Sequence, residues 1–112
     1  MEIRQSEVNG IKVLDVEGDV NMDNSQELRA VFKQLVKDGV KKLLVDLSGS
    51  NYIDSSCLAT FIEMRKNMRE MDGNIYISSV SGKVKGIFEV SKVDTLFKIF
   101  SSKTEALAQI QQ

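Results

Sequence analysis

The hydrophobic pattern of the chain changes at the stretch Tyr52-Ile53-Asp54-Ser55-Ser56-Cys57-Leu58. Before it, Lys42 to Leu47 is an apolar run of the length of one buried strand. Its three successive apolar residues, 43–45, are typical of a central strand covered on both faces. After the stretch, residues recur at offsets of three and four as on one face of a helix, namely Leu58, Phe61, Ile62, Arg65 and Met68. The pattern therefore predicts that a strand ends here and that a helix follows from about Ser56 to Met71.

Asp54, Ser55 and Ser56 occupy the predicted start of this helix, and all three are residue types that cap helices well. A helix start presents unpaired backbone N–H groups and the positive end of the helix dipole, so it favours a negative group. Two hydroxyls at this place could carry a phosphate. The sequence leaves two interpretations open for the serines, a plain helix cap or a site of phosphorylation, and one hydroxyl could serve as both.

The composition is that of an ordinary globular domain, and we expect residues 1–112 to form one domain. Apolar residues make up 42% of the chain and charged residues 28%, with a formal net charge of -1. This balance gives no electrostatic reason to expect nucleic acid or an anionic membrane as partner. No apolar run is long enough to span a bilayer, the first residues are no signal peptide, and the single cysteine excludes an internal disulfide. We therefore expect a cytoplasmic protein.

The absence of histidine weighs against an enzyme. It removes the usual general base, the Ser-His and Cys-His pairs, and the commonest metal ligand, so we expect no catalytic site, no cofactor and no metal. An enzyme would need Ser55 or Cys57 with Lys or Asp as base, and no such constellation is visible. Cys57 near a helix start could have a lowered pKa and react, or it could be a small buried residue, and the charge of Asp54 opposes the first interpretation.

The remaining elements are predicted from turn signals and periodicity. Asn9-Gly10 joins the strands Glu2 to Val8 and Ile11 to Glu17 as a type I′ hairpin. Asn24 and Glu27 stand at capping-box spacing before a helix that Gly39 ends, with apolar residues at 28, 31, 32, 35 and 36. Residues 75–77 form a further strand, parallel to the strand that begins at Lys42 because a helix connects the two.

The C-terminal third is predicted to contain two short helices. One runs from Gly82 to Val90. A dense apolar group from Val93 to Phe100 then forms a turn and a brief strand, and a capping box at Ser102-Lys103-Thr104-Glu105 opens the last helix. The predicted fold is α/β, a mixed sheet of four or five strands with about four helices, mostly on one side of the sheet and around its ends.

Four segments in order resemble one family. They are Gly18 to Asp23, Asp46-Leu47-Ser48, Asp54-Ser55-Ser56-Cys57-Leu58, and the late stretch from Val84 to Phe97. Together they are similar to the STAS domains of bacterial anti-sigma factor antagonists, whose motif reads Asp-Ser-Ser/Thr/Ala-Gly-Leu at a strand-to-helix junction. The resemblance covers nearly the whole chain and implies a STAS-like single domain.

The resemblance implies a partner-switching protein that is not itself an enzyme. Unphosphorylated, such a domain binds an anti-sigma factor that is also a serine kinase and so frees the sigma factor. The kinase modifies the serine after the motif aspartate, here Ser55, and a metal-dependent serine/threonine phosphatase reverses the step. The partner surface implied by the resemblance consists of the motif, the first turn of the following helix and the loop before the first helix: Asn21, Asp23, Asp54, Ser55, Ser56, Cys57, Ala59 and Thr60.

The chain departs from the family pattern at two positions. Cys57 replaces the motif glycine and Asn21 replaces an acidic residue, and we expect Cys57 to place a side chain beside the docking surface. Asp54 is either a competing cap or the acidic group that positions the kinase, and Ser56 is a cap or the modified serine. We expect a monomer or weak dimer. The rival interpretations are a scaffold subunit of a signalling assembly, and a partner switch with a non-sigma output such as secretion.

Overall fold

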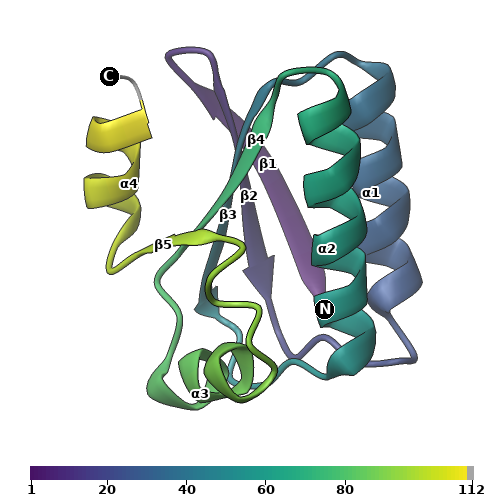
Figure 1. Ribbon diagram of the computed structural model, residues 1–112, viewed down its shortest axis with the longest axis vertical. Coiled ribbons are helices and arrows are strands. Elements are labelled where there is room, and N and C mark those ends of the chain that lie inside the picture. The colour runs from purple at the N-terminus through teal and green to yellow at the C-terminus, as the bar shows by residue number, and fades with distance from the viewer. Residues whose placement is uncertain (111–112) are drawn as a thin grey trace.

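Five strands form one mixed sheet in the computed structural model, which describes residues 1–110 (Figure 1). Their order across the sheet follows the sequence, β1-β2-β3-β4-β5. The first pair is antiparallel and every later pair is parallel. The strands are β1 (Glu2–Val8), β2 (Ile11–Glu17), β3 (Lys42–Gly49), β4 (Asn74–Ser78) and β5 (Lys98–Phe100). The predicted α/β class and the parallel pairing of β3 with β4 are confirmed.

The hairpin between β1 and β2 follows the prediction. Val8 pairs with Ile11, so only Asn9 and Gly10 remain in the turn. Their φ angles of +48° and +83° are the positive values that a type I′ turn needs. The turn therefore fixes the register of the first two strands.

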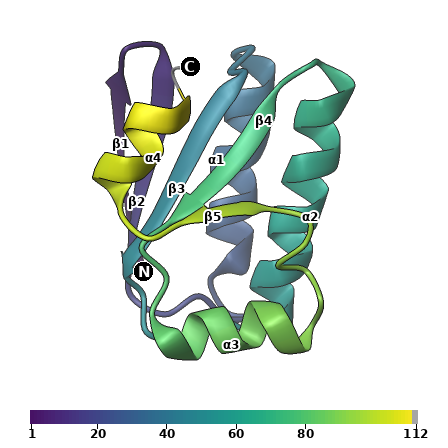
Figure 2. The same ribbon diagram turned by 60° about the vertical axis from the view of Figure 1, so that its left-hand side comes forward.

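The four helices of the described chain lie on both faces and at one end of the sheet. They are α1 (Ser25–Lys37), α2 (Ser55–Glu70), α3 (Gly82–Val90) and α4 (Lys103–Ile110). Figures 1 and 2 show α1 and α2 side by side on one face, α4 on the other face, and α3 across the end at which β3 and β4 finish. The predicted bounds of α3 are correct, and those of α2 are correct to within one residue at each end.

Two hydrophobic clusters explain this arrangement. β3 contributes five consecutive buried residues, Leu43 to Leu47, and its apolar side chains alternate between the faces, as the two-residue repeat of a strand requires. Leu43, Val45 and Leu47 pack in the larger cluster, under α1 and α2, whereas Leu44 packs in the smaller one, under α4. The larger cluster contains four phenylalanine rings, of Phe32, Phe61, Phe88 and Phe97.

The capping box predicted at Asn24 is wrong. The Asn24 side chain makes no cap bond to α1. Instead its Oδ1 accepts from the backbone N–H of Asn21 at 2.9 Å, and its Nδ2 donates to the carbonyl of Asp19 at 3.0 Å. The side chain thus holds the loop before α1 together. At α4 the prediction is half correct, because Ser102 Oγ accepts from the Glu105 N–H at 3.1 Å while the Glu105 carboxylate accepts from the Ser101 hydroxyl.

Candidate functional site

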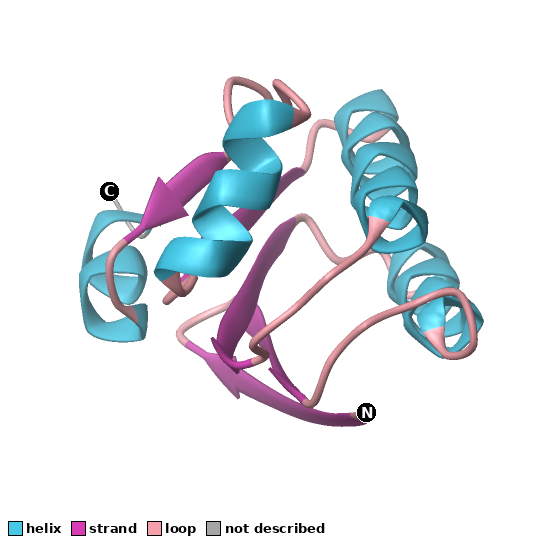
Figure 3. Ribbon diagram, turned by 90° about the horizontal axis from the view of Figure 1, so that it is seen from below, coloured by secondary structure: helices cyan, strands magenta, loops and turns pink. Residues whose placement is uncertain are grey.

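The two loops that the sequence singled out lie side by side. Residues 18–24 connect β2 to α1, and residues 50–54 connect β3 to α2. Val20 and Ile53 form an isolated parallel bridge. The Val20 N–H donates to the carbonyl of Tyr52 and the Asp54 N–H donates to the carbonyl of Val20, both at 3.1 Å. These bonds bring the start of α2 next to the loop before α1, at the end of the molecule seen in Figure 3.

Asp54 is the residue that joins this pair of loops to α2. It is the N-cap, and its Oδ1 accepts from the backbone N–H groups of Ser56 at 2.9 Å and Cys57 at 3.3 Å. Its Oδ2 accepts from the backbone N–H of Met22 at 3.0 Å. One carboxylate thereby satisfies two of the unpaired N–H groups of the helix and fixes the neighbouring loop.

The same contacts keep Asp54 ionised. Desolvation, the largest single influence, raises the pKa of Asp54, but the hydrogen bonds from the Ser56 hydroxyl and from the three backbone N–H groups together lower it below its usual value. Hydrogen bonds to a charged form favour that form. The helix start therefore already holds one negative charge.

The two serines differ sharply in their surroundings. Ser56 donates its hydroxyl to Asp54 Oδ1 at 2.5 Å and is half-buried. Ser55 is the first residue of α2 and is exposed, and within residues 1–110 its hydroxyl takes part in no hydrogen bond. The plain-cap interpretation of Ser55 is wrong, because Asp54 is the cap. The Ser55 oxygen is thus open to an incoming reagent.

Two of the expected partner-binding residues have buried side chains. Cys57 is 0% exposed within the larger cluster, and burial, aided by the charge of Asp54, raises the pKa of its thiol to about 12. Thr60 is also buried, and its hydroxyl donates to the Ser56 carbonyl at 2.9 Å. The expectation that Cys57 places a side chain beside the docking surface is therefore wrong, and a thiol in this state is not a nucleophile.

Other predicted residues meet on one exposed surface, together with two that the sequence analysis did not select. Asp23, Ser55 and Ala59 are exposed, and Asn21 is half-buried, with its Oδ1 accepting from the Asp23 N–H. Met22 and Tyr52 lie among them, 77% and 41% exposed. Met22 is an apolar residue in a polar loop, and this was the signal that could have identified it. We define the site surface as Asn21, Met22, Asp23, Tyr52, Asp54, Ser55, Ser56 and Ala59.

A buried carboxylate links β3 to the end of β4. Asp46, in the second half of β3, is 2% exposed. It accepts hydrogen bonds from the Ser48 N–H and from the hydroxyls of Ser48, Ser78 and Ser79. Desolvation, the largest influence, raises its pKa, but these donors together lower it below the usual value. Asp46 thus ties the end of β3 to the end of β4, from which the chain enters α3.

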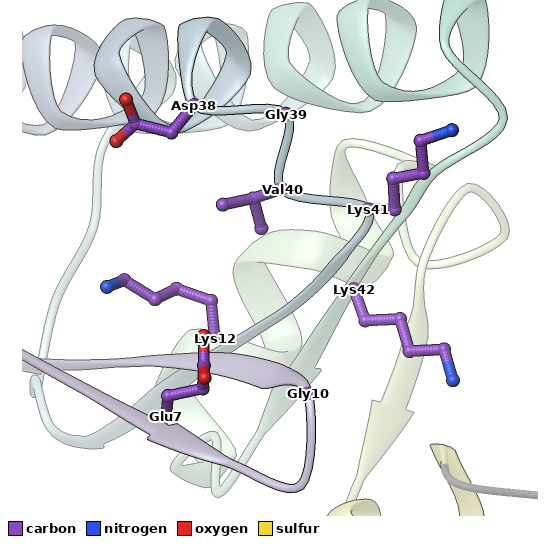
Figure 4. Close-up of a pocket in the computed structure, with 8 residues that line it drawn as sticks. All are labelled: Glu7, Gly10, Lys12, Asp38, Gly39, Val40, Lys41 and Lys42. Carbon is purple, nitrogen blue, oxygen red and sulfur yellow. The ribbon is translucent and has the colours of Figure 1, made fainter.

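One cavity lies away from the site surface. It measures about 390 Å³ and is bounded by the β1–β2 turn, the end of α1 and the start of β3. Figure 4 shows the side chains of Lys12, Lys41 and Lys42 pointing in different directions, so they do not converge on a ligand. Within residues 1–110 no group of three His, Cys, Asp or Glu side chains could hold a metal ion, and no helix is long and apolar enough to cross a bilayer.

The fold and the site define a small α/β domain whose distinctive feature is an exposed hydroxyl at a strand-to-helix junction. Comparison with known proteins gives the family. Residues 2–106 match the STAS domain family. The chain therefore belongs to the STAS domain family, as its motifs indicated.

Relatives of similar length carry related names. "Putative anti-sigma factor antagonist BtrV" of Bordetella bronchiseptica is 25% identical over 108 residues, which are 96% of this chain and 93% of BtrV. An anti-sigma-B factor antagonist of Staphylococcus aureus is 27% identical over 84 residues, which are 75% of this chain and 78% of that protein.

Solved structures confirm the fold. A Thermotoga maritima protein superposes with a TM-score of 0.92 at 22% identity, covering 98% of this chain and 95% of its own. The Bacillus cell fate determinant SpoIIAA, in its phosphorylated form, gives a TM-score of 0.77 at 14% identity and covers 97% of this chain and 99% of its own.

Proposed function

We propose that this chain is an anti-sigma factor antagonist controlled by phosphorylation of Ser55. In the unphosphorylated form the site surface binds an anti-sigma factor that is also a serine kinase, and the sigma factor is released. The observation that carries this proposal is the exposed Ser55 hydroxyl, free of hydrogen bonds within the described residues, beside the exposed Met22 and Tyr52. The names of the relatives support the same function.

The proposed modification is a phosphoryl transfer carried out by the partner. The Ser55 Oγ attacks the γ-phosphorus of ATP and a new O–P bond forms. The bond between the γ-phosphorus and the bridging oxygen of the β-phosphate breaks, ADP leaves, and the serine proton passes to a base of the kinase. A metal-dependent serine/threonine phosphatase hydrolyses the ester and restores the hydroxyl. This chain is the substrate in both steps. We also propose that the protein is cytoplasmic, that it is a monomer or weak dimer, and that it has no catalytic activity or cofactor of its own.

Ser56 is the less suitable acceptor for two physical reasons. Its hydroxyl already donates to Asp54, and it is half-buried. A phosphate on Ser56 would replace that donor by a dianion beside the Asp54 carboxylate and would disturb the cap of α2. A phosphate on Ser55 leaves every hydrogen bond of Asp54 in place.

Phosphorylation at Ser55 would change binding far more than folding. The phosphate adds about -1.5 to -2 charges at pH 7. The dipole of α2 would stabilise it by roughly 0.3–1 kcal/mol, and the ionised Asp54 would offset part of this gain. At an interface, burial of an unmatched dianion costs several kcal/mol, and about 4 kcal/mol corresponds to roughly a thousandfold loss of affinity. The switch therefore acts through local charge, without a large conformational change.

A phosphorylation assay tests the assignment of the acceptor. The unmodified protein is used to isolate a kinase that binds it, and the purified kinase is incubated with the protein and ATP. Mass spectrometry should locate one phosphate, on Ser55, and the Ser55→Ala variant should take up none. A phosphate on Ser56, or undiminished incorporation in Ser55→Ala, would refute the assignment.

Matched variants test the charge mechanism. Ser55→Asp should weaken binding of the kinase while Ser55→Ala retains it. Ser6, on the exposed face of β1, supplies the control, since Ser6→Asp makes the same chemical change far from the site. Weakening by Ser6→Asp equal to that by Ser55→Asp would mean that net charge, and not the site surface, governs binding.

A further inference from the structure

The outer face of α3 exposes one large apolar side chain, that of Val90, close to a glycine of the same helix. Val84 and Phe88 are buried in the core. Helical geometry places Gly86 and Val90 on the opposite side of α3, and Val90 is 86% exposed, the largest exposed fraction among the large hydrophobic residues of the described chain. A shallow groove of about 320 Å³ runs over this face, lined by Lys83, Gly86, Ile87, Val90 and Ser91.

Gly86 has no structural reason to be glycine within the described chain. It lies inside a helix of nine residues, and it is not among the residues with positive φ. A Cβ atom added at this position would meet nothing within 4 Å, so no neighbour excludes a side chain. Glycine inside a helix is less favourable than alanine. The glycine thus weakens a short helix and leaves a shallow depression next to Val90.

This face of α3 is continuous with the site surface. Lys83 Nζ lies 5.4 Å from the centre of the Tyr52 ring. Tyr52 belongs to the site surface, and its carbonyl accepts the hydrogen bond from the Val20 N–H. Within residues 1–110 the Lys83 ammonium lies over the Tyr52 ring and forms no ion pair, so it can still face an acidic group of a partner. Figures 1 and 3 show α3 at the same end of the molecule as the start of α2.

We propose that the outer face of α3 is a second part of the docking surface for the kinase that binds at Ser55. An apolar side chain of the kinase packs on Gly86 against Val90, and an acidic residue next to it faces Lys83. This inference rests on the proposed function and adds to it. Because these residues lie outside the modified serine, phosphorylation leaves them chemically unchanged, and they set which kinase is chosen, whereas Ser55 sets whether it stays bound.

Binding measurements with the purified kinase test the proposal. Gly86→Trp fills the depression and Val90→Glu adds a charge to it, and each should raise the dissociation constant by about tenfold or more, the effect of blocking a central contact. Ala108 lies exposed on α4, on the other face of the sheet, so Ala108→Trp and Ala108→Glu make changes of similar size elsewhere. Both controls should bind like the wild type. Wild-type affinity of Gly86→Trp and Val90→Glu would overturn the proposal.

Gly86→Ala separates folding from binding. Because the site is open, this variant should raise the melting temperature by roughly 4 °C through helix propensity alone, and circular dichroism of every variant should match the wild type. If Gly86→Trp weakens binding of the kinase but melts at or above the wild-type temperature, the loss of binding cannot be due to a folding defect. A fall in the melting temperature of Gly86→Ala would show that the glycine serves the fold, and the proposal would fail.

The outcomes distinguish this inference from the function on which it rests. If Ser55→Asp weakens binding of the kinase but the α3 variants do not, only the inference on α3 fails. If Ser55→Asp and Ser55→Ala bind equally, the proposed function fails. If Val90→Glu abolishes self-association in sedimentation equilibrium while kinase affinity is unchanged, a second copy of the chain occupies the groove, which also overturns the proposal.

Discussion

Replacement of Asp54 by alanine should loosen the start of α2 and the loop before α1 together. The substitution removes the N-cap, which typically costs about 1 kcal/mol, and leaves the Ser56 and Cys57 N–H groups without their side-chain acceptor. It also removes the acceptor of the Met22 N–H, an exposed hydrogen bond worth roughly 0.5–1 kcal/mol. We therefore expect the free energy of unfolding to fall by about 2 kcal/mol, or Tm to fall by roughly 8 °C.

Urea denaturation and amide hydrogen exchange measure the two effects separately. Unfolding should show a lower midpoint with an unchanged m-value, because no additional surface is exposed. Exchange at Met22 should accelerate in Asp54→Ala, while exchange in β3 should change only as global stability changes. Asp54→Asn is the matched control, since its carbonyl oxygen can keep the cap bonds of Oδ1 while its amide nitrogen cannot accept from Met22.

The control gives the result that would refute this reasoning. Asp54→Asn should lose about half as much stability as Asp54→Ala, while Met22 exchange accelerates in both. If Asp54→Ala unfolds at the wild-type urea concentration, the carboxylate does not join the loop to the helix. If Met22 exchange is unaffected in both variants, the bond between the loops has no energetic significance.

Three further changes test other parts of the structure. Phe61→Ala should lower the free energy of unfolding by about 3–5 kcal/mol in urea denaturation, because its buried ring contacts three other phenylalanine rings at centroid distances of 5.7–6.4 Å; a loss below about 1 kcal/mol would contradict this packing. The pKa of Asp46 is lowered in the folded state, so the stability that its ionised form contributes is present above the unfolded pKa of about 3.9 and is lost as pH falls through the folded pKa. Asp46→Asn should therefore make the free energy of unfolding fall less steeply at acid pH. An unchanged pH dependence in Asp46→Asn would argue against an ionised Asp46. Cys57 should react with a thiol reagent only as fast as the protein opens, since the thiol is buried and its pKa is raised to about 12; rapid stoichiometric labelling of the native protein would show that it is accessible.

Local signals predicted the elements well. The Asn9-Gly10 turn and the bounds of α3, Gly82 to Val90, depend only on neighbouring residues, and the structure agrees with them. The family motif likewise located the junction between β3 and α2. Such features are set by backbone conformation and periodicity, which the sequence contains directly.

Contacts between distant segments were not predictable in the same way. The choice of Asp54 over Ser55 as cap depends on helix geometry at a single residue, and the bond from Met22 depends on the pairing of two loops 32 residues apart. Burial of Cys57 could have been predicted, because Phe61 and Met64 follow it by four and seven residues on the buried face of α2. The Asn24 side chain could bond either to the first turn of α1 or to the loop before it. In the structure it bonds to the loop, at Asn21 and Asp19.

The central claim is that one phosphate on Ser55 abolishes docking by charge alone. The direct measurement is the affinity of the purified kinase for this protein before and after stoichiometric phosphorylation at Ser55, with amide exchange recorded on both forms. We predict a loss of affinity of about a thousandfold, with exchange protection of α2 and the sheet preserved. Equal affinity of the two forms would contradict the claim, and so would a loss accompanied by unfolding of α2.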